Sequence, residues 1–539
     1  MSGLRPQNTF TNISGRAKFE RFVTSQVWRE EVLPVIQQIL PSLKFKAKAK
    51  IARWTVESVG DDQHIHDFFV RNWHAAENQD ETHIHSWHIA HCKNSELLRK
   101  ILGLKSDLDV ASRRDQFLKF LEDPLFRVCL KDSDYLNFAM QSDERQRELA
   151  VFAPAFIYCP EERSSVSLNT TYYGQFKSKS VLGILEEYLI QQMAYVRGDL
   201  KNAASVWLSM HAGGAEYFTQ KREKRGIIIV GPTGTAKSTH AYGLSEAKNE
   251  NRIHSDDWLF VNIGTGEVLG AERSFYMRTP MARFYTDCTE KFLSAPLENV
   301  PFTEAVLQIL KNNGERDLTS NENKSILRDL CATLAARALV LAEDFLPEHK
   351  RCSEMKVTDI FIVKRDEGSA SVIRKIKGEE MIRFLVSQDN VFQYRRDPDR
   401  LGEEVFDKKT TEYYLNPYLC RTDFYKGNPG DLDRRRIDAW THLASMPRIS
   451  IFELNAFLPV PVTQFCLRRF LEGDLDEISF KGGMVEFKLI DKVLENIVFT
   501  KAGDFSSADQ AVLNSWSLGD AKAFFKHYEY LNAAALFSI

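Results

Sequence analysis

The residues Gly226–His240 constrain the fold of this chain more than any other stretch. The β-branched run Ile227–Val230 leads into a glycine-containing turn, and Lys237–Thr239 follows where a helix can begin. This order predicts a buried strand, a loop whose backbone N–H groups bind phosphate oxygens, and a helix N-terminus. The alternative is an ordinary strand-to-helix turn. We disfavour it because the strand, the glycines, the lysine and the serine all fall in register.

The loop motif predicts a task for several of these residues. Lys237 is expected at the terminal phosphates of a nucleotide, and the Ser238 hydroxyl at a divalent cation. Ala236 stands where the ideal motif has glycine, so the motif is preserved provided that this position needs no left-handed backbone. The residues expected to bind the nucleotide are Gly231, Thr233, Gly234, Thr235, Ala236, Lys237, Ser238 and Thr239.

Composition narrows the class of protein. The chain has 539 residues, 43% of them hydrophobic, which is enough for roughly two to four folding units. Its net charge of −3 gives no general nucleic-acid signature. No run of about 18 apolar residues suits a membrane span, and Met1–Arg21 lacks a signal-peptide core. Eight scattered cysteines without a CxxC pair indicate reduced thiols, so we expect a cytoplasmic enzyme.

Seven histidines lie between His64 and His91. The alternating stretches His64–Trp73 and Thr82–Cys92 predict a β-hairpin or two adjacent strands, on which His64/His66 and His83/His85 would each share a face. A transition-metal site is one interpretation. We favour polar strand positions instead, because no cysteine or carboxylate completes a familiar ligand spacing.

Two adjacent acids follow the loop. Asp256 and Asp257 lie in Arg252–Val261, a predicted strand about 20 residues after Lys237, where a metal-holding acid is expected beside a nucleotide. Asp359–Val363 predicts a further buried strand, and Lys291–Ala342 predicts a largely helical insertion.

Taken together, five stretches resemble the ATP-dependent phosphoenolpyruvate carboxykinases and their HPr-kinase-like relatives. Besides the phosphate loop, Thr171–Ser180 resembles the family's T-W-Y-G-G-E-M-K-K-G, and Ser209–Ala212 its S-M-H-C. Ser255–Asp257 and Glu272–Arg278 resemble its G-D-D and E-G-G-C-Y-A-K. Order and spacing agree from about Asp132 to Arg278.

The resemblance implies an α/β fold with two lobes, mixed sheets and a phosphate-loop nucleotide lobe. Its implied divisions are 1–130, a divergent N-terminal helical/β region; 131–222, the N-terminal α/β lobe; 223–400, the nucleotide- and metal-binding lobe with a helical insertion near 291–345; and 401–539, a region completing the nucleotide lobe.

The resemblance also implies a metal site. Lys179, His211 and Asp257 fall where the family coordinates a transition metal, typically Mn²⁺. An amine, an imidazole and a carboxylate form a mixed N/O set, and the lysine can bind only if the cation depresses its pKa. Asp256 would orient the metal waters.

Further residues match the family's nucleotide and substrate positions. Lys237 would contact the β- and γ-phosphates of ATP, and Ser238 would bind its Mg²⁺. Glu272 and Arg278 fall where the family contacts the nucleotide sugar and the terminal phosphate, and Tyr173 where it contacts substrate. Arg278 replaces a lysine but keeps the positive charge.

The half of the site that would bind a dicarboxylate differs from the family pattern. Ser178 replaces the first of two adjacent lysines, and the first 130 residues contain no counterpart of the acceptor-binding arginine in T-G-R-S-P. The R-x-S-Y-P arginine is missing from Val340–Pro347, and Arg337 is a substitute without a supporting register. Two carboxylates normally require several convergent cations.

Three functions therefore remain open. We expect an ATP- and divalent-metal-dependent phosphotransferase that uses Lys237, Arg278 and Lys179, with Asp256 as the base for an unidentified hydroxyl acceptor. The first alternative is a carboxykinase that converts oxaloacetate to phosphoenolpyruvate. The second is a nucleotide-binding regulatory pseudoenzyme. The sequence does not indicate an oligomeric state.

Overall fold

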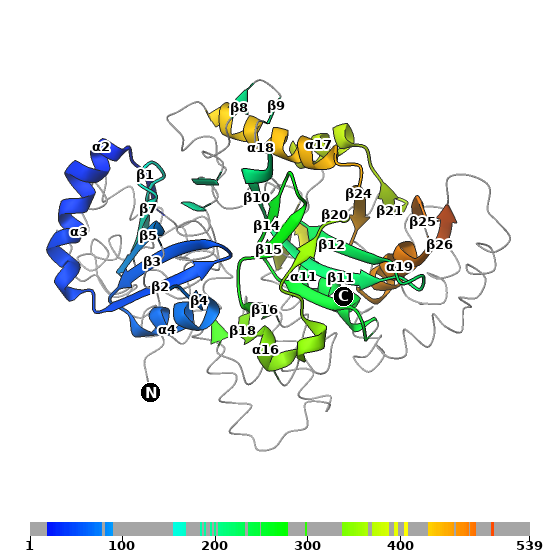
Figure 1. Ribbon diagram of the computed structural model, residues 1–539, viewed down its shortest axis with the longest axis horizontal. Helices are drawn as coiled ribbons and strands as arrows, with labels where there is room; N and C mark the ends of the chain where they lie inside the picture. Colours follow the sequence, from blue (N-terminus) through cyan, green and yellow to red (C-terminus); the bar gives the residue numbers. More distant parts are fainter. Residues whose placement is uncertain are drawn as a thin grey trace, which may run out of the picture.

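The computed structural model describes the chain in segments (Figure 1). They are residues 19–77, 81–89, 155–168, 184–185, 188–189, 195–196, 199–200, 203–231, 235–247, 249–278, 291, 297–298, 337–364, 369–386, 393–396, 404–407, 429–456, 460–473, 475–480 and 497–500. The described part is mixed α/β with several sheets, as the sequence predicts at the level of fold class.

An eight-stranded sheet contains the predicted phosphate-loop strand. Its order is β13 (Arg252–Ser255), β11 (Ala212–Phe218), β12 (Lys224–Val230), β20 (Asp359–Lys364), β24 (Ser450–Asn455), β21 (Ser371–Lys375), β25 (Glu477–Phe480) and β26 (Ile497–Thr500). The neighbours β12, β20 and β24 run parallel, while β11 is antiparallel to both β12 and β13. The end of β13, the start of β11 and the ends of β12, β20 and β24 therefore share one edge, here called the carboxyl edge.

Both faces of this sheet are covered. On one face, Ile227 and Ile229 pack with α11 (Lys237–Glu246) and α19 (Val460–Gly473). On the other, Ile228 and Val230 pack with α17 (Gly378–Val386), α18 (Pro429–Ala444) and a second sheet. That four-stranded sheet has the order β10 (Trp207–Met210), β14 (Leu259–Asn262), β15 (Glu267–Gly270) and β19 (Met355–Lys356). The apolar run in β12 is continuous because both faces are buried.

A seven-stranded sheet forms the N-terminal part of the molecule (Figure 1). Its order is β1 (Phe19–Phe22), β6 (Ala155–Cys159), β7 (Ser164–Leu168), β5 (Thr82–Ile89), β3 (Trp54–Gly60), β2 (Phe45–Ile51) and β4 (His74–Ala75). One face packs on α4 (Gln63–Asn72). The other packs on the segment formed by α2 (Ser25–Val27), a π-helix (Trp28–Val32), α3 (Leu33–Ile39) and a 3₁₀ turn (Leu40–Ser42).

The predicted strand at His64–Trp73 is wrong, because these residues form α4. Asp62 caps the helix by accepting a hydrogen bond from the Ile65 N–H at 2.9 Å, and Ile65, Phe68 and Phe69 bury one helical face. Positions i and i+2 of a helix do not share a face, so the predicted His64/His66 pairing is wrong too. Thr82–Ile89 is a strand as predicted, but it pairs with β3 and β7. The described residues contain no group of three or more His, Cys, Asp or Glu side chains that could hold a metal.

Most of the predicted helical insertion Lys291–Ala342 lies outside the described residues. Its described residues include β17 (Leu297–Glu298) and β18 (Arg337–Leu341), which pair with β16 (Ser274–Arg278) in a three-stranded sheet. The short helix α16 (Ala342–Phe345) follows. The remaining elements are β8 (Tyr195–Val196), β9 (Asp199–Leu200), β22 (Gln393–Arg396), β23 (Glu404–Asp407) and 3₁₀ turns at Ala203–Ser205 and Glu348–Lys350.

A single apolar cluster joins the N-terminal sheet to the four-stranded sheet. The Trp54 ring of β3 lies 4.7 Å from Phe260 of β14 and 5.9 Å from Trp207 of β10, both in edge-on geometry. Arg53 lies over the Trp207 ring at 5.6 Å. Aromatic pairs of this kind add to the free energy gained by burying their area.

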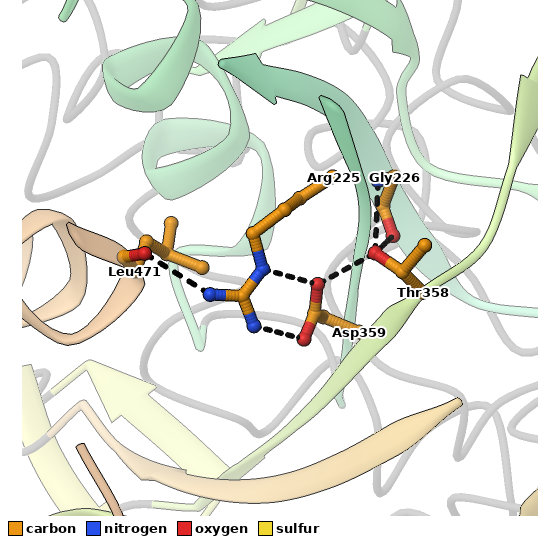
Figure 2. Close-up of polar contacts among 5 residues, drawn as sticks. All are labelled: Arg225, Gly226, Thr358, Asp359 and Leu471. Carbon is orange, nitrogen blue, oxygen red and sulfur yellow. Dashed lines mark hydrogen bonds and ion pairs between the residues drawn. The ribbon is translucent and has the colours of Figure 1, made fainter. Parts of the chain in front are cut away.

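The amino-terminal ends of β12 and β20 are joined by a network of polar contacts (Figure 2). The Arg225 guanidinium donates to both carboxylate oxygens of Asp359 and, through Nη1, to the Leu471 carbonyl at 3.0 Å. The Thr358 hydroxyl donates to Asp359 Oδ2 at 2.6 Å and accepts from the Gly226 N–H at 3.0 Å. This network, here called the base clamp, fixes the register of the two parallel strands.

None of the helices in the described segments is both long and apolar enough to cross a membrane.

Candidate functional site

The phosphate-loop stretch adopts the predicted order of strand, loop and helix in its described residues. β12 ends at Val230, and α11 begins at Lys237. Gly231 is required by close contacts, since a Cβ there would lie 2.8 Å from Thr235 Oγ1 and 3.1 Å from Val363 Cβ. Thr233 and Gly234 lie outside the described residues.

Ala236 adopts the left-handed conformation, with φ 63° and ψ 25°, so the condition under which alanine would replace glycine without strain is not met. An L-residue here is disfavoured by about 1 kcal/mol relative to the right-handed region, because Cβ approaches the following carbonyl. The loop therefore keeps the backbone shape that suits glycine although it carries alanine. No side chain caps the helix that follows, and its first turn has no acidic residue.

The two residues after Ala236 differ in exposure. Lys237 is buried, with 5% of its surface exposed, whereas Ser238 is half-buried and Thr239 is buried. Lys237 and Ser238 thus begin a helix at the carboxyl edge of the sheet, next to uncapped backbone N–H groups. Helix N-termini of this kind favour anions.

His211 and Asp257 meet where two strands pass from one sheet to the other. The chain leaves β10, turns at His211 and enters β11, and it leaves β13, turns at Asp256-Asp257 and enters β14. The predicted single strand Arg252–Val261 is therefore two strands in different sheets. Asp257 makes this bend possible with a φ of 66°, which aspartate tolerates better than most residues.

The turn at His211 and the turn at Asp256-Asp257 are hydrogen-bonded to each other, and the first is hydrogen-bonded to the loop. His211 Nε2 lies 2.9 Å from Asp257 Oδ1, and the Trp258 ring stacks on the imidazole with centroids 6.2 Å apart. The Ala212 N–H donates to the Asp257 carbonyl at 3.1 Å, and the Gly231 N–H donates to the His211 carbonyl at 3.3 Å. The structure thus brings together the predicted residues His211, Asp257 and Gly231.

Asp256 points the other way, toward β16. It is 2% exposed, and its Oδ2 accepts a hydrogen bond from the Tyr276 N–H at 3.3 Å. This contact places β16, whose last residue is Arg278, beside the acids. Glu272 is half-buried between β15 and β16.

The pairing of β16 with β18 gives Arg337 a register, which the sequence alone does not provide. In the antiparallel pair of β16 and β18, Arg337 is the direct partner of Arg278. Two arginines are therefore directly opposed in this strand pair, two residues along β16 from Tyr276, whose N–H contacts Asp256.

Two residues of α19 hold the helix that follows the loop, and no sequence signal predicted them. Gln464 Nε2 donates to the His240 carbonyl at 2.9 Å and lies 2.9 Å from His240 Nδ1. Arg468 donates to the Gly243 carbonyl. A glycine, Gly213, lets α11 approach β11, since a Cβ there would lie 3.1 Å from Ala241 Cβ.

One histidine, His254, lies on β13. Burial lowers the pKa of His254, whose Nδ1 lies 3.0 Å from the Cys352 carbonyl. Its imidazole is therefore neutral in the folded protein.

Two predicted site residues, Tyr173 and Lys179, lie outside the described residues. No protein-family model matches the chain, and no curated protein matches it either.

Proposed function

We propose that this chain is an ATP- and divalent-metal-dependent phosphotransferase. One observation carries the proposal: the loop that starts at Gly231 is bonded to the corner that holds His211 and Asp257, at the carboxyl edge where parallel strands end. Open α/β sheets bind ligands outside the carboxyl ends of their strands. A phosphate-binding loop, a buried lysine and the pair of buried His211 with half-buried Asp257 form a set suited to triphosphate chemistry.

Each residue has a defined task in this proposal. The N–H groups at the start of α11 bind phosphate oxygens, and Lys237 neutralises the charge that develops as the γ-phosphoryl group leaves ADP. Ser238 offers its hydroxyl to the Mg²⁺ that accompanies ATP. Burial of Lys237 strengthens its attraction for phosphate, since water screens it less.

His211 and Asp257 fit a second cation, for which Mn²⁺ is the candidate. Two ligand atoms each about 2.1 Å from an octahedral cation lie about 3 Å apart, close to the separation of His211 Nε2 and Asp257 Oδ1. Lys179 would be the third ligand. A cation held there supplies positive charge and polarises oxygen atoms of the transferred group. Asp256 is the candidate base for a hydroxyl acceptor, with a buried carboxylate oriented by the Tyr276 N–H.

A second candidate function is the carboxykinase reaction, and one observation favours it. Arg278 and Arg337 are directly opposed in the register of β16 and β18, and a dicarboxylate acceptor such as oxaloacetate requires convergent cations. The other alternative, a regulatory pseudoenzyme, rests on Ala236 in the loop. Its left-handed backbone supports that alternative, because the loop adopts at this position a conformation that alanine disfavours.

The experiment that tests the proposal follows γ-phosphate transfer from radiolabelled ATP with Mg²⁺ and Mn²⁺. Purified protein is incubated with a cell extract, and in a parallel reaction with oxaloacetate, with Lys237→Met as the control. Labelled phosphoenolpyruvate identifies the carboxykinase, and another labelled product identifies a kinase acceptor. If ATP binds but no label moves above the control in either reaction, the phosphotransferase proposal is wrong and the pseudoenzyme remains.

A further inference from the structure

Positive charge is concentrated on one strand of the N-terminal sheet, although the whole chain carries a net charge of −3. Residues 44–57 contain four lysines and one arginine against a single acid, Glu57. Three of the lysines, Lys46, Lys48 and Lys50, alternate along β2 with Ala47 and Ala49. Alternate residues of a strand share a face, so the three lysines form a row with a spacing of about 6.8 Å.

The row continues across the sheet to the next two strands. Lys48 is the cross-strand partner of Glu57, which is the partner of His85 on β5. Lys46 pairs with Val59, which pairs with Trp87. Glu57, His85 and Trp87 therefore lie on the same face as the lysines.

Cations gather near the Glu57 carboxylate on this face. Lys46 Nζ lies 2.7 Å from Glu57 Oε1, and His85 Nδ1 lies 3.5 Å from Glu57 Oε2. Arg163 adds a cation where β7 begins; its carbonyl accepts from the His85 N–H at 3.0 Å, and its guanidinium lies over the Tyr188 ring. Lys46, Lys48 and Arg163 all act on His85 electrostatically, opposed by Glu57. The Lys46 and His85 side chains are 65% and 41% exposed.

Two rings are stacked among these charges. The His85 and Trp87 rings are nearly parallel, 18° apart, with centroids separated by 5.7 Å, and Trp28 supports Trp87 from the covering helical segment. Partial burial lowers the pKa of His85, and Arg163, Lys48 and Lys46 lower it further, while Glu57 opposes them. The imidazole is therefore a neutral planar surface at pH 7. We call the set Lys46, Lys48, Lys50, Arg163, His85 and Trp87 the basic face.

We propose that the basic face binds single-stranded nucleic acid, with the cations along the phosphates and a base on the His85 ring. Other proteins bind single-stranded nucleic acid with the same combination, a row of cations along the phosphates and rings that stack on the bases. The lysines on β2 could also serve to discourage edge-to-edge aggregation of sheets. That role does not require the stacked rings of His85 and Trp87 on β5.

The other polyanionic partners fit less well. A membrane surface is bound through protruding apolar side chains as well as cations. The large exposed hydrophobic residues of the described chain are Leu40 and Val70, and neither belongs to the basic face. An acidic protein segment would use the cations but not the stacked rings.

Binding is measured by fluorescence anisotropy with 12-nucleotide oligouridine RNA and oligothymidine DNA between 50 and about 300 mM KCl. Each phosphate neutralised on a single strand contributes about 0.7 to the salt slope, so four cations predict a slope of roughly −2 to −3. The double variant Lys46→Ala/Lys48→Ala is expected to flatten the slope by about 1.4. A matched control, Lys221→Ala/Lys356→Ala, removes two exposed lysines of the other sheets and should leave it unchanged.

The variant His85→Ala distinguishes the contribution of base stacking to binding from that of charge. Loss of a stacked base weakens binding about fivefold or more, and the salt slope should stay the same because the ring is neutral. Comparison of the RNA and DNA arms identifies which nucleic acid is preferred, since only RNA offers a 2′-hydroxyl. Lys237→Met should bind both oligonucleotides normally, so the outcome is independent of the phosphotransferase proposal.

Three results would overturn the proposal. The first is no oligonucleotide binding at 50 mM KCl, or a lysine double variant that binds like the matched control. The second is equal affinity for inorganic polyphosphate together with an unaffected His85→Ala, which would mark a general anion-binding surface. The third is binding to vesicles with 30% phosphatidylserine but not to oligonucleotides, which would indicate a membrane partner.

Discussion

The two ends of the paired strands β12 and β20 differ in how their polar groups are used. At the amino-terminal end, the base clamp joins Arg225, Thr358 and Asp359 in mutually satisfied hydrogen bonds. At the carboxyl end, the chain turns at Gly231 into the loop, whose last residue before α11 is Ala236 in a disfavoured backbone conformation.

The amino-terminal end of this strand pair therefore contributes to stability, and the carboxyl end carries the proposed site. In the clamp, Arg225 and Thr358 donate to the Asp359 carboxylate, which is 2% exposed, and Arg225 also donates to the Leu471 carbonyl, an arrangement that stabilises strand pairing. The carboxyl end instead combines left-handed residues at Ala236 and Asp257 with a helix terminus that no side chain caps. Strained backbone tends to cluster at binding sites, where ligand contacts offset it.

The largest expected effect comes from breaking the clamp. Asp359→Ala leaves the Arg225 guanidinium without its carboxylate, and we expect the free energy of unfolding to fall by about 3–5 kcal/mol. Urea unfolding followed by tryptophan fluorescence measures the loss, and calorimetry measures ATP affinity of the folded fraction, which should not change. The double variant Arg225→Met/Asp359→Leu should recover most of the stability. A parallel loss of ATP affinity would abolish the distinction between the two ends.

Lys237→Met tests the opposite end. We expect phosphoryl transfer to fall by about 100- to 1000-fold, as when a preorganised charge is removed from a transition state, with little change in urea midpoint. Lys350→Met is the matched control, because Lys350 is also buried but donates to the Ser245 carbonyl near the end of the same helix, at 2.7 Å. This control should lose stability and retain turnover. The reverse pattern would contradict the assignment of Lys237.

His211→Ala tests whether the sheet corner holds a cation. We expect Mn²⁺ affinity, measured by electron paramagnetic resonance, to fall at least 10- to 100-fold, since even outer partners of metal ligands have effects of that size. ATP affinity without Mn²⁺ should be nearly unchanged. His254→Asn alters the nearby histidine on β13 and should bind Mn²⁺ normally. Equal Mn²⁺ binding by His211→Ala and the native protein refutes the metal assignment.

The smallest effect concerns the strained residue of the loop. Ala236→Gly removes the Cβ that disfavours a positive φ, and the gain is offset in part by the entropy of glycine in the unfolded chain, leaving about 1 kcal/mol or less. Ala52→Gly is the control, since Ala52 has a similar φ of 55° in the β2–β3 turn. Both variants should show similar changes in stability by urea unfolding. Only Ala236→Gly should alter ATP affinity, and identical ATP affinities would show that the strain has no functional role.

The strands that position the site were predictable because their signal is local. β12 and β20 are short uninterrupted runs of β-branched and aromatic residues, and burial of both faces makes such runs continuous. The loop residues were proposed from spacing alone. The contact between His211 and Asp257 forms because the end of β10 and the end of β13 lie close together in space. Spacing along the sequence does not predict such a contact, and the proximity of the two residues was proposed from the resemblance to the carboxykinases.

The errors have physical causes as well. In His64–Trp73, the histidines suggested alternation, while Asp62 as a cap and the spacing of Ile65, Phe68 and Phe69 were the overlooked helical signal. Asp257 divides one predicted strand into two through a positive φ that no propensity indicates. Arg337 was set aside because its partner Arg278 lies far away in sequence, and only the register of β16 and β18 joins them.

The contact of Trp54 with Phe260 and Trp207 limits how this protein can move and how it can be divided. Since these rings share one apolar cluster, the N-terminal sheet cannot rotate as an independent body without exposing an indole to water. A fragment that ends before Trp207 would leave the Trp54 ring without its packing partners and should aggregate on expression.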